Sequence, residues 1–194
     1  MDKIGKQESD IDWPSESVLF SNTTKQEMEM TTLADRVAVA TRLRIRGIPT
    51  EGVSRMRRGE PDANDQPALE QVAEGLTNPC RHCLGLIAEG DKKLILAYRP
   101  FNVLQPYAET GPIFLHGEPC ERYDCEVLPA WFDHLDPAIV RGYGADDWIR
   151  YDTGRVVPGR ELMAACQAIL SDATVAYVHI RSRYNCFQCR VERG

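Results

Sequence analysis

The sequence lacks several features that would assign a chain to a class at once. It holds no apolar run long enough to span a bilayer, so we expect no membrane-spanning helix and no membrane partner. The N-terminus shows no basic segment followed by an apolar one, so we expect no secretory signal. Internal repeats, low-complexity tracts and phosphate-binding glycine loops are also missing. Together these absences favour a cytoplasmic location.

An excess of positive charge is missing as well. The chain carries 23 basic and 29 acidic residues, a formal net charge of −6, which predicts no nucleic-acid partner. Its seven cysteines are an odd number. Without an export signal we expect reduced thiols and no disulfide framework, and some of the thiols are candidate metal ligands.

What is present fits one globular domain with a tail. The 194 residues are 43% hydrophobic and 27% charged, which is typical of a soluble fold. Residues 1–30 hold seven acids against three lysines and show no sustained periodicity, so they are predicted to be a disordered acidic tail. Residues 31–194 are predicted to form a single α+β domain. The apolar cluster Trp13–Phe20 within the tail is a candidate partner-binding segment.

The clearest pattern lies at the C-terminus, where two runs of alternating residues, Val175–Arg181 and Cys186–Glu192, predict a β-hairpin. If the four residues between them form the loop, apolar residues pair with apolar ones. This register places Arg181 directly opposite Cys186. A nearby cation lowers the pKa of a thiol, so this pairing predicts an activated cysteine. Cys189 is predicted to lie in the core.

The remaining patterns give more strands than helices. Strands are predicted at 37–45, 94–98, 113–116, 139–143, 148–151 and 155–157, and helices at 67–76, 129–135 and 161–171; a helix at 33–40 is an alternative to the start of the first strand. Many strands follow each other without an intervening helix. The pattern therefore favours an α+β fold with a mixed or mainly antiparallel sheet, a few helices and the C-terminal hairpin in the sheet.

Several blocks in this order resemble a bacterial family known only as domain of unknown function 1203. They are Pro79-Cys80-Arg81 with Leu84, Leu94–Tyr98, Pro106-Tyr107 through Gly111-Pro112-Ile113-Phe114, Arg141-Gly142-Tyr143, Ala176–His179, Cys186-Phe187 and Arg190–Arg193. The resemblance covers about residues 42–194 and omits the tail. It implies no activity, cofactor or catalytic residue.

Our first functional hypothesis is a polar face that binds a small anionic ligand, a carboxylate or phosphate. Its catalytic candidates are Cys186, His179 and Arg181, because a thiol beside histidine and arginine can act as a nucleophile. The ligand-binding candidates are Cys80, Arg81, Tyr107, Tyr177, Gln188 and Arg190, with Glu109 and His116 from the Tyr107 loop as further members. This hypothesis needs no cofactor. The plain alternative is the solvated side of an antiparallel sheet, so the sequence leaves open whether the protein is an enzyme.

The second hypothesis is a non-enzymatic interaction domain stapled by zinc. Two Cys-x-x-Cys pairs, Cys80/Cys83 and Cys186/Cys189, offer four soft ligands. Two points oppose this set: the pairs lie far apart in sequence, and Cys186 and Cys189 face opposite ways in a regular strand. A redox role for Cys80 and Cys83 is a third reading, although the pair follows a predicted helix and a proline instead of preceding a helix.

Overall fold

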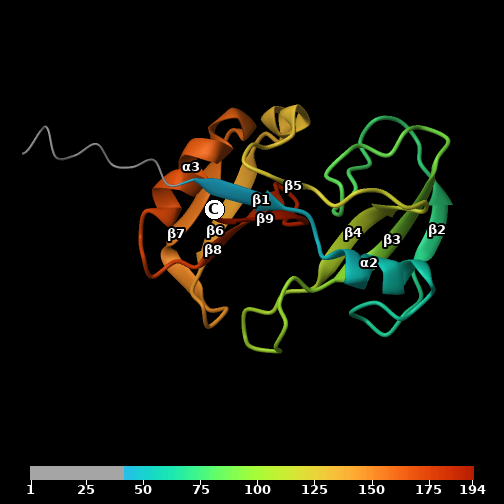
Figure 1. Ribbon diagram of the computed structural model, residues 1–194, viewed down its shortest axis with the longest axis horizontal. Helices are drawn as coiled ribbons and strands as arrows, with labels where there is room; N and C mark the ends of the chain where they lie inside the picture. The colour runs from blue at the N-terminus through green and yellow to red at the C-terminus, as the bar shows by residue number, and fades with distance from the viewer. Residues whose placement is uncertain (1–41) are drawn as a thin grey trace, which may run out of the picture. The chain divides into compact units, whose positions relative to one another are not determined.

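The computed structural model describes residues 42–194 (Figure 1). The predicted tail, its apolar cluster and residues 31–41 lie outside the described residues. The described elements are β1 Leu43–Arg46, α2 Thr50–Arg57, β2 Leu69–Val72, β3 Lys92–Tyr98, β4 Gly111–His116, β5 Asp124–Cys125, the 3-10 helix η1 Ala130–His134, β6 Ala138–Tyr143, β7 Ile149–Val157, the 3-10 helix η2 Gly159–Glu161, α3 Leu162–Leu170, β8 Tyr177–Ser182 and β9 Phe187–Arg193. Within this range, every helix is too short or too polar to cross a membrane.

The strands form two antiparallel sheets. The larger sheet has the order β5-β1-β9-β8-β6-β7, and the smaller has the order β2-β3-β4. Every pairing between these strands is antiparallel. The C-terminal hairpin β8–β9 lies in the middle of the larger sheet. The predicted α+β class, with mainly antiparallel strands and this hairpin in the sheet, is confirmed.

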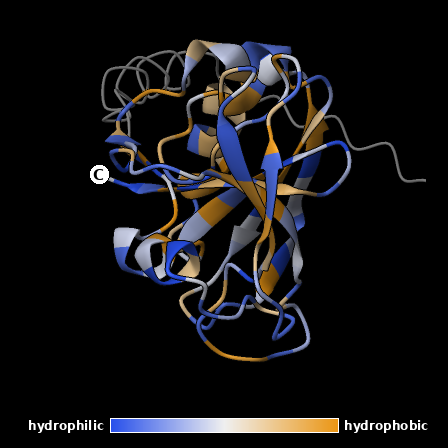
Figure 2. Ribbon diagram, turned by 90° about the vertical axis from the view of Figure 1, so that its right-hand side faces the viewer, coloured by the Kyte–Doolittle hydropathy of each residue, from blue (hydrophilic) through white to orange (hydrophobic). Residues whose placement is uncertain are grey.

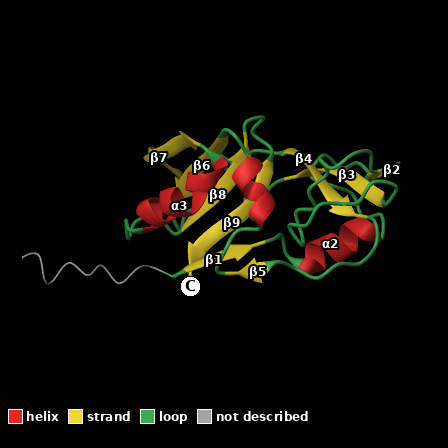
Figure 3. Ribbon diagram, turned by 90° about the horizontal axis from the view of Figure 1, so that it is seen from above, coloured by secondary structure: helices red, strands yellow, loops and turns green. Residues whose placement is uncertain are grey.

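One face of the larger sheet packs against α3, which lies along β6 and β8 (Figure 3). The helix buries Leu162, Cys166 and Ile169, the side predicted from its spacing. These residues meet Val178 and Ile180 of β8 in a continuous apolar core. Along the strands, hydrophobic and hydrophilic residues alternate, which is the pattern of a sheet with two different faces (Figure 2).

The smaller sheet has its own core. Leu94 and Leu96 of β3 and Ile113 of β4 pack with Val53 of α2, and α2 lies beside these strands in Figure 1. Phe187 of β9 joins this second core instead of the first. Phe187 is therefore a contact between the two sheets.

The predicted register of the hairpin is wrong by two residues. His179 lies opposite Arg190 instead of Gln188, and Ile180 lies opposite Cys189 instead of Phe187. The turn accounts for one of the two residues of this register shift. Asn185 adopts a left-handed conformation (φ 67°), and the Ser182 N–H donates to the Cys186 carbonyl at 3.0 Å, so the loop has three residues instead of four.

The second residue of the difference comes from a β-bulge in β9 between its pairs with Ile180 and Arg181. Beyond the bulge each residue regains its predicted face, and Cys189 is fully buried in the α3 core as predicted. Between the turn and the bulge, the residues of β9 lie on the face opposite to the one predicted. Arg181 therefore lies opposite Phe187, and the predicted pairing of Arg181 with Cys186 is wrong.

The predicted helix at 67–76 is also wrong. Its segment contains the strand β2, which pairs with β3. Leu69 and Val72 are 57% and 62% exposed, so the apolar spacing that suggested a buried helix face buries neither residue. The backbone pairing with a buried neighbouring strand overrides a weak helical preference.

The core assignment predicts a contrast between two substitutions in the larger sheet. Ile180→Ala removes a fully buried side chain and should lower the free energy of unfolding by about 2–5 kcal/mol. Val156→Ala, at a position 67% exposed on the edge strand β7, should cost less than about 1 kcal/mol. Urea unfolding of both variants measures the difference, and equal costs would contradict the assignment.

Candidate metal centre

Residues 79–86 form a tight turn that points two thiols the same way. The Cys80 N–H donates to the Gly85 carbonyl at 2.9 Å, and Pro79 bridges to Leu86. Leu84 takes a left-handed conformation (φ 53°), which reverses the chain after Cys83. The Gly85 N–H then lies 3.4 Å from the Cys83 sulfur as a donor. We call residues 79–86 the knuckle.

The knuckle is attached to the end of β4. The Arg81 N–H donates to the Phe114 carbonyl at 3.0 Å, and the His116 N–H points at the Cys80 sulfur at 3.4 Å. His116 is the last residue of β4, and Cys120 follows four residues later in the loop toward β5. This backbone pairing brings the His116 and Cys120 side chains to the two knuckle thiols.

The four side chains Cys80, Cys83, His116 and Cys120 form a compact ligand set. Their donor atoms all lie within 4.8 Å of one another. The Cys80 and Cys120 sulfurs are 3.9 Å apart, and the Cys83 sulfur is 3.4 Å from His116 Nδ1. A tetrahedral zinc ion, with bonds of about 2.3 Å to sulfur and about 2.0–2.1 Å to nitrogen, separates two sulfurs by about 3.8 Å and a sulfur from a nitrogen by about 3.6 Å. Both distances match that tetrahedron closely.

The electrostatics of the site favour a thiolate at Cys80. The hydrogen bond from the Cys83 thiol lowers the pKa of Cys80, and main-chain N–H groups of Cys83, His116 and His82 lower it further, while burial acts in the opposite sense. The same hydrogen bond, together with burial, raises the pKa of Cys83. The thiolate is the form of cysteine that binds metals.

Two further side chains support Cys120 from outside the ligand set. The Arg57 guanidinium of α2 lies 3.3 Å from the Cys120 sulfur, where its charge offsets that of a thiolate. The fully buried His82 contacts the same sulfur at 3.2 Å through Nδ1 and Thr50 Oγ1 at 2.9 Å through Nε2. Burial lowers the pKa of His82, so the ring is neutral. The tautomer that satisfies both contacts donates from Nδ1 to the sulfur and accepts the Thr50 hydroxyl at Nε2.

The structure corrects the predicted four-cysteine zinc set. Cys80 and Cys83 belong to the cluster, but His116 and Cys120 take the places of Cys186 and Cys189. Cys189 is buried in the α3 core, and Cys186, in the turn before β9, lines a separate cavity.

The residues of the predicted polar face are likewise divided between two cavities. Cys186, Arg81 and Gln188 line a cavity of about 740 Å³, whereas His179 and Arg190 line a different cavity of about 200 Å³. The structure therefore does not bring Cys186 together with His179.

The other predicted face residues contact side chains of the protein. Arg181 forms an ion pair with Glu109 at 2.9 Å, and every residue of β8 is buried, so this side of the sheet is not solvated. The Arg190 guanidinium stacks on the Tyr177 ring at 3.6 Å. Tyr107 lies at the surface, where its hydroxyl contacts that of Tyr151 at 3.0 Å.

The sequence patterns did not predict His116 and Cys120 as candidate metal ligands. His116 entered only the anion-binding hypothesis, and Cys120 entered neither hypothesis. The available signal was a His-x-x-x-Cys pair that starts 33 residues after the Cys80-x-x-Cys83 pair. That separation is much shorter than the one between the two Cys-x-x-Cys pairs.

Comparison with known proteins gives one match. A family model described as "Protein of unknown function (DUF1203)" matches residues 77–193. This segment contains the four ligand candidates and both strands of the C-terminal hairpin. The chain matches no curated protein and no solved structure.

Close contact between the knuckle and the β1–α2 loop predicts the effect of two glycine substitutions. A Cβ atom at Gly47 would lie 1.9 Å from the His82 carbonyl oxygen, so Gly47→Ala should lower the free energy of unfolding by about 1–3 kcal/mol. The matched control is Gly52→Ala within α2, where no atom lies within 4 Å of the added Cβ. That control should be stabilising by about 0.5–1 kcal/mol. Thermal or urea unfolding checks both signs, and a neutral Gly47→Ala would contradict the packing.

Proposed function

The chain belongs to the DUF1203 family of proteins of unknown function, and we propose that it is a non-enzymatic domain stapled by zinc. The observation that carries the proposal is the convergence of four donor atoms, three sulfurs and one imidazole nitrogen, within 4.8 Å. The donors come from two segments, the knuckle and the end of β4 with its following loop. A metal ion on these donors would join the two segments.

The chemistry of the ligand set selects zinc. Thiolate and imidazole ligands suit Zn²⁺, whereas Mg²⁺ and Ca²⁺ prefer oxygen ligands, of which the set has none. Four protein donors fill a tetrahedral shell and leave no position for a substrate or an activated water. A closed shell of this kind is typical of structural zinc sites, which supports the non-enzymatic reading.

The surroundings explain why this part of the fold would need a staple. The smaller sheet has three strands, and the segment from Gly117 to Tyr123 has no regular secondary structure. Small sheets with limited cores gain stability from bound metal, because the ion binds the folded chain and not the unfolded one. Three reduced thiols at one site also suit a reducing compartment, which supports the expected cytoplasmic location.

Metal analysis of the purified protein tests the proposal directly. We expect one zinc ion per chain by mass spectrometry, and a tetrahedral cobalt spectrum with thiolate charge-transfer bands after substitution by Co²⁺. Cys120→Ala should lose the ion. The matched control Cys125→Ala, at an exposed cysteine outside the cluster, should keep it. Fully reduced protein that takes up no zinc on reconstitution would refute the proposal.

Zinc binding should also depend on pH. Because the thiols and the imidazole must lose their protons to bind the ion, acid displaces zinc and apparent affinity falls as pH decreases. At free zinc about 1,000 times its dissociation constant, the ion should contribute about 4 kcal/mol to the free energy of unfolding. Thermal unfolding with and without a chelator, at pH 5 and pH 8, measures this. A melting temperature unaffected by the chelator at pH 8 would contradict a stabilising ion.

A further inference from the structure

A second site lies on the face of the larger sheet opposite α3. It is a cavity of about 200 Å³ between the ends of β1 and β3 and the strands β8 and β9. Arginines line much of its wall: Arg46, Arg99, Arg122 and Arg190. The cavity shares none of the four metal-ligand candidates, so it is independent of the zinc proposal.

The positive charge of this wall exceeds the negative charge. Its two carboxylates are Asp147 and Glu192. Glu192 is already paired with Arg46 at 2.6 Å and with Arg190 at 2.5 Å. Four guanidinium groups against two carboxylates leave two positive charges without a counter-charge among the lining residues.

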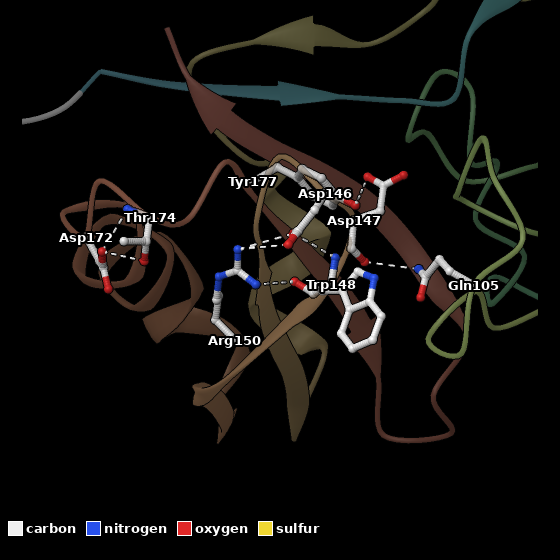
Figure 4. Close-up of polar contacts among 8 residues, drawn as sticks. All are labelled: Gln105, Asp146, Asp147, Trp148, Arg150, Asp172, Thr174 and Tyr177. Atoms are coloured by element: carbon white, nitrogen blue, oxygen red, sulfur yellow. Dashed lines mark hydrogen bonds and ion pairs between the residues drawn. The ribbon is translucent and has the colours of Figure 1, made fainter.

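The second carboxylate is held away from the remaining arginines. Asp147 sits in the turn between β6 and β7, where its side chain accepts a hydrogen bond from the Tyr177 hydroxyl at 2.7 Å (Figure 4). Gln105 donates to the Asp147 carbonyl at 3.0 Å and fixes the turn further (Figure 4). No ion pair joins Asp147 to an arginine within residues 42–194.

Two arginines therefore keep donors for a ligand. The Arg122 Nε donates a hydrogen bond to the Gly47 carbonyl at 2.9 Å. The two terminal nitrogens of Arg122 form no hydrogen bond with the part of the chain described. Arg99 forms no side-chain hydrogen bond and no ion pair in that same part. The planar fork of a guanidinium matches the two oxygens of a carboxylate or phosphate.

His179 supplies a neutral polar group at the same cavity. Its side chain is fully buried, and neither ring nitrogen has a hydrogen-bond partner among the described residues. Aromatic rings surround it, including Tyr143 at 4.8 Å and Phe187 at 5.0 Å between ring centroids. Burial, and then the charges of nearby arginines, hold the pKa of His179 well below its usual value. An unpaired buried polar group destabilises the fold, and a ligand atom in the cavity would relieve that cost.

We infer that this cavity binds a small organic oxyanion, a carboxylate or phosphate on an apolar body. The oxyanion lies between Arg99 and Arg122, and a hydrogen-bonding atom of the ligand faces His179. The rings of Tyr98, Phe101 and Phe187 also line the cavity and cover the apolar body. The volume of about 200 Å³ lies below the range of about 300–1,000 Å³ typical of sites for drug-sized ligands, so the ligand is small.

Titration of the full-length protein with benzoate, phenyl phosphate and the neutral analogue benzamide tests the inference. The protein has four histidines, so their ring resonances are resolvable by NMR, and loss of one signal in His179→Phe assigns His179. We expect saturable binding of benzoate or phenyl phosphate with a shift of the His179 resonance. Benzamide should bind at least about tenfold more weakly, because it lacks the charge. Tighter binding of benzoate identifies the oxyanion as a carboxylate, and tighter binding of phenyl phosphate identifies it as a phosphate.

Arginine variants separate this site from general surface attraction. Arg99→Gln should weaken binding of the preferred anion by about 10- to 100-fold, because a charge-assisted hydrogen bond is lost. The matched control Arg160→Gln changes an arginine with a 71% exposed side chain outside the cavity and should bind as the parent does. His179→Phe keeps the buried ring shape and should also bind more weakly. Absence of saturable binding, equal affinity in Arg99→Gln, or an equal loss in Arg160→Gln would overturn the inference.

Discussion

The β-bulge in β9 places Phe187 and Cys189, two residues that a regular strand would point to the same face, in two different cores. Cys189 points toward α3, while Phe187 points toward the smaller sheet, where its ring lies 5.6 Å from that of Tyr98. The Phe187 carbonyl accepts a hydrogen bond from the Arg81 side chain at 2.8 Å, and Arg81 belongs to the knuckle. The α3 core, the second core and the candidate metal centre are therefore linked through one irregular point in a strand. A regular β9 would place Phe187 on the same face as Cys189, toward α3, and remove the link.

Alternation in the sequence was sufficient to predict what alternation physically controls. It identified most strands, the buried face of α3 and the burial of Cys189, because the side chains of regular elements repeat with a fixed period. It could not predict the register of the hairpin. That register depends on the left-handed Asn185 and on the bulge, two local departures from regular geometry with weak sequence signals. The prediction for the exposed edge strand β2 failed for a related reason. Pairing with its partner strand, and not its own sequence pattern, sets its conformation.

The two candidate sites show the same limit at longer range. Composition and spacing indicated that Cys80 and Cys83 could bind metal, and that His179 and Arg190 share a face. The partners that complete each site come from elsewhere in the chain: His116 and Cys120 for the metal, Arg99 and Arg122 for the cavity. Sequence also suggested that the polar face of β8 is either a pocket or a solvated surface. In the structure this face is buried and not solvated. Part of the reason is that Glu109 forms ion pairs with both Arg141 and Arg181, two residues far from it in the sequence.

The separation of the ligands along the chain has a consequence for chain entropy. An ion that joins Cys83 to His116 closes a loop of 33 residues, and this loop contains the strand β3 and most of β4. A permanent cross-link of that span removes about 4 kcal/mol of loop-closure freedom from an unfolded chain. A metal ion removes this much freedom only while the unfolded chain keeps the ion bound. The stabilisation by the cross-link therefore depends on the lifetime of the metal–sulfur bonds. Two of the three strands of the smaller sheet, β3 and most of β4, therefore lie within a loop whose closure is as reversible as the bonds to the ion.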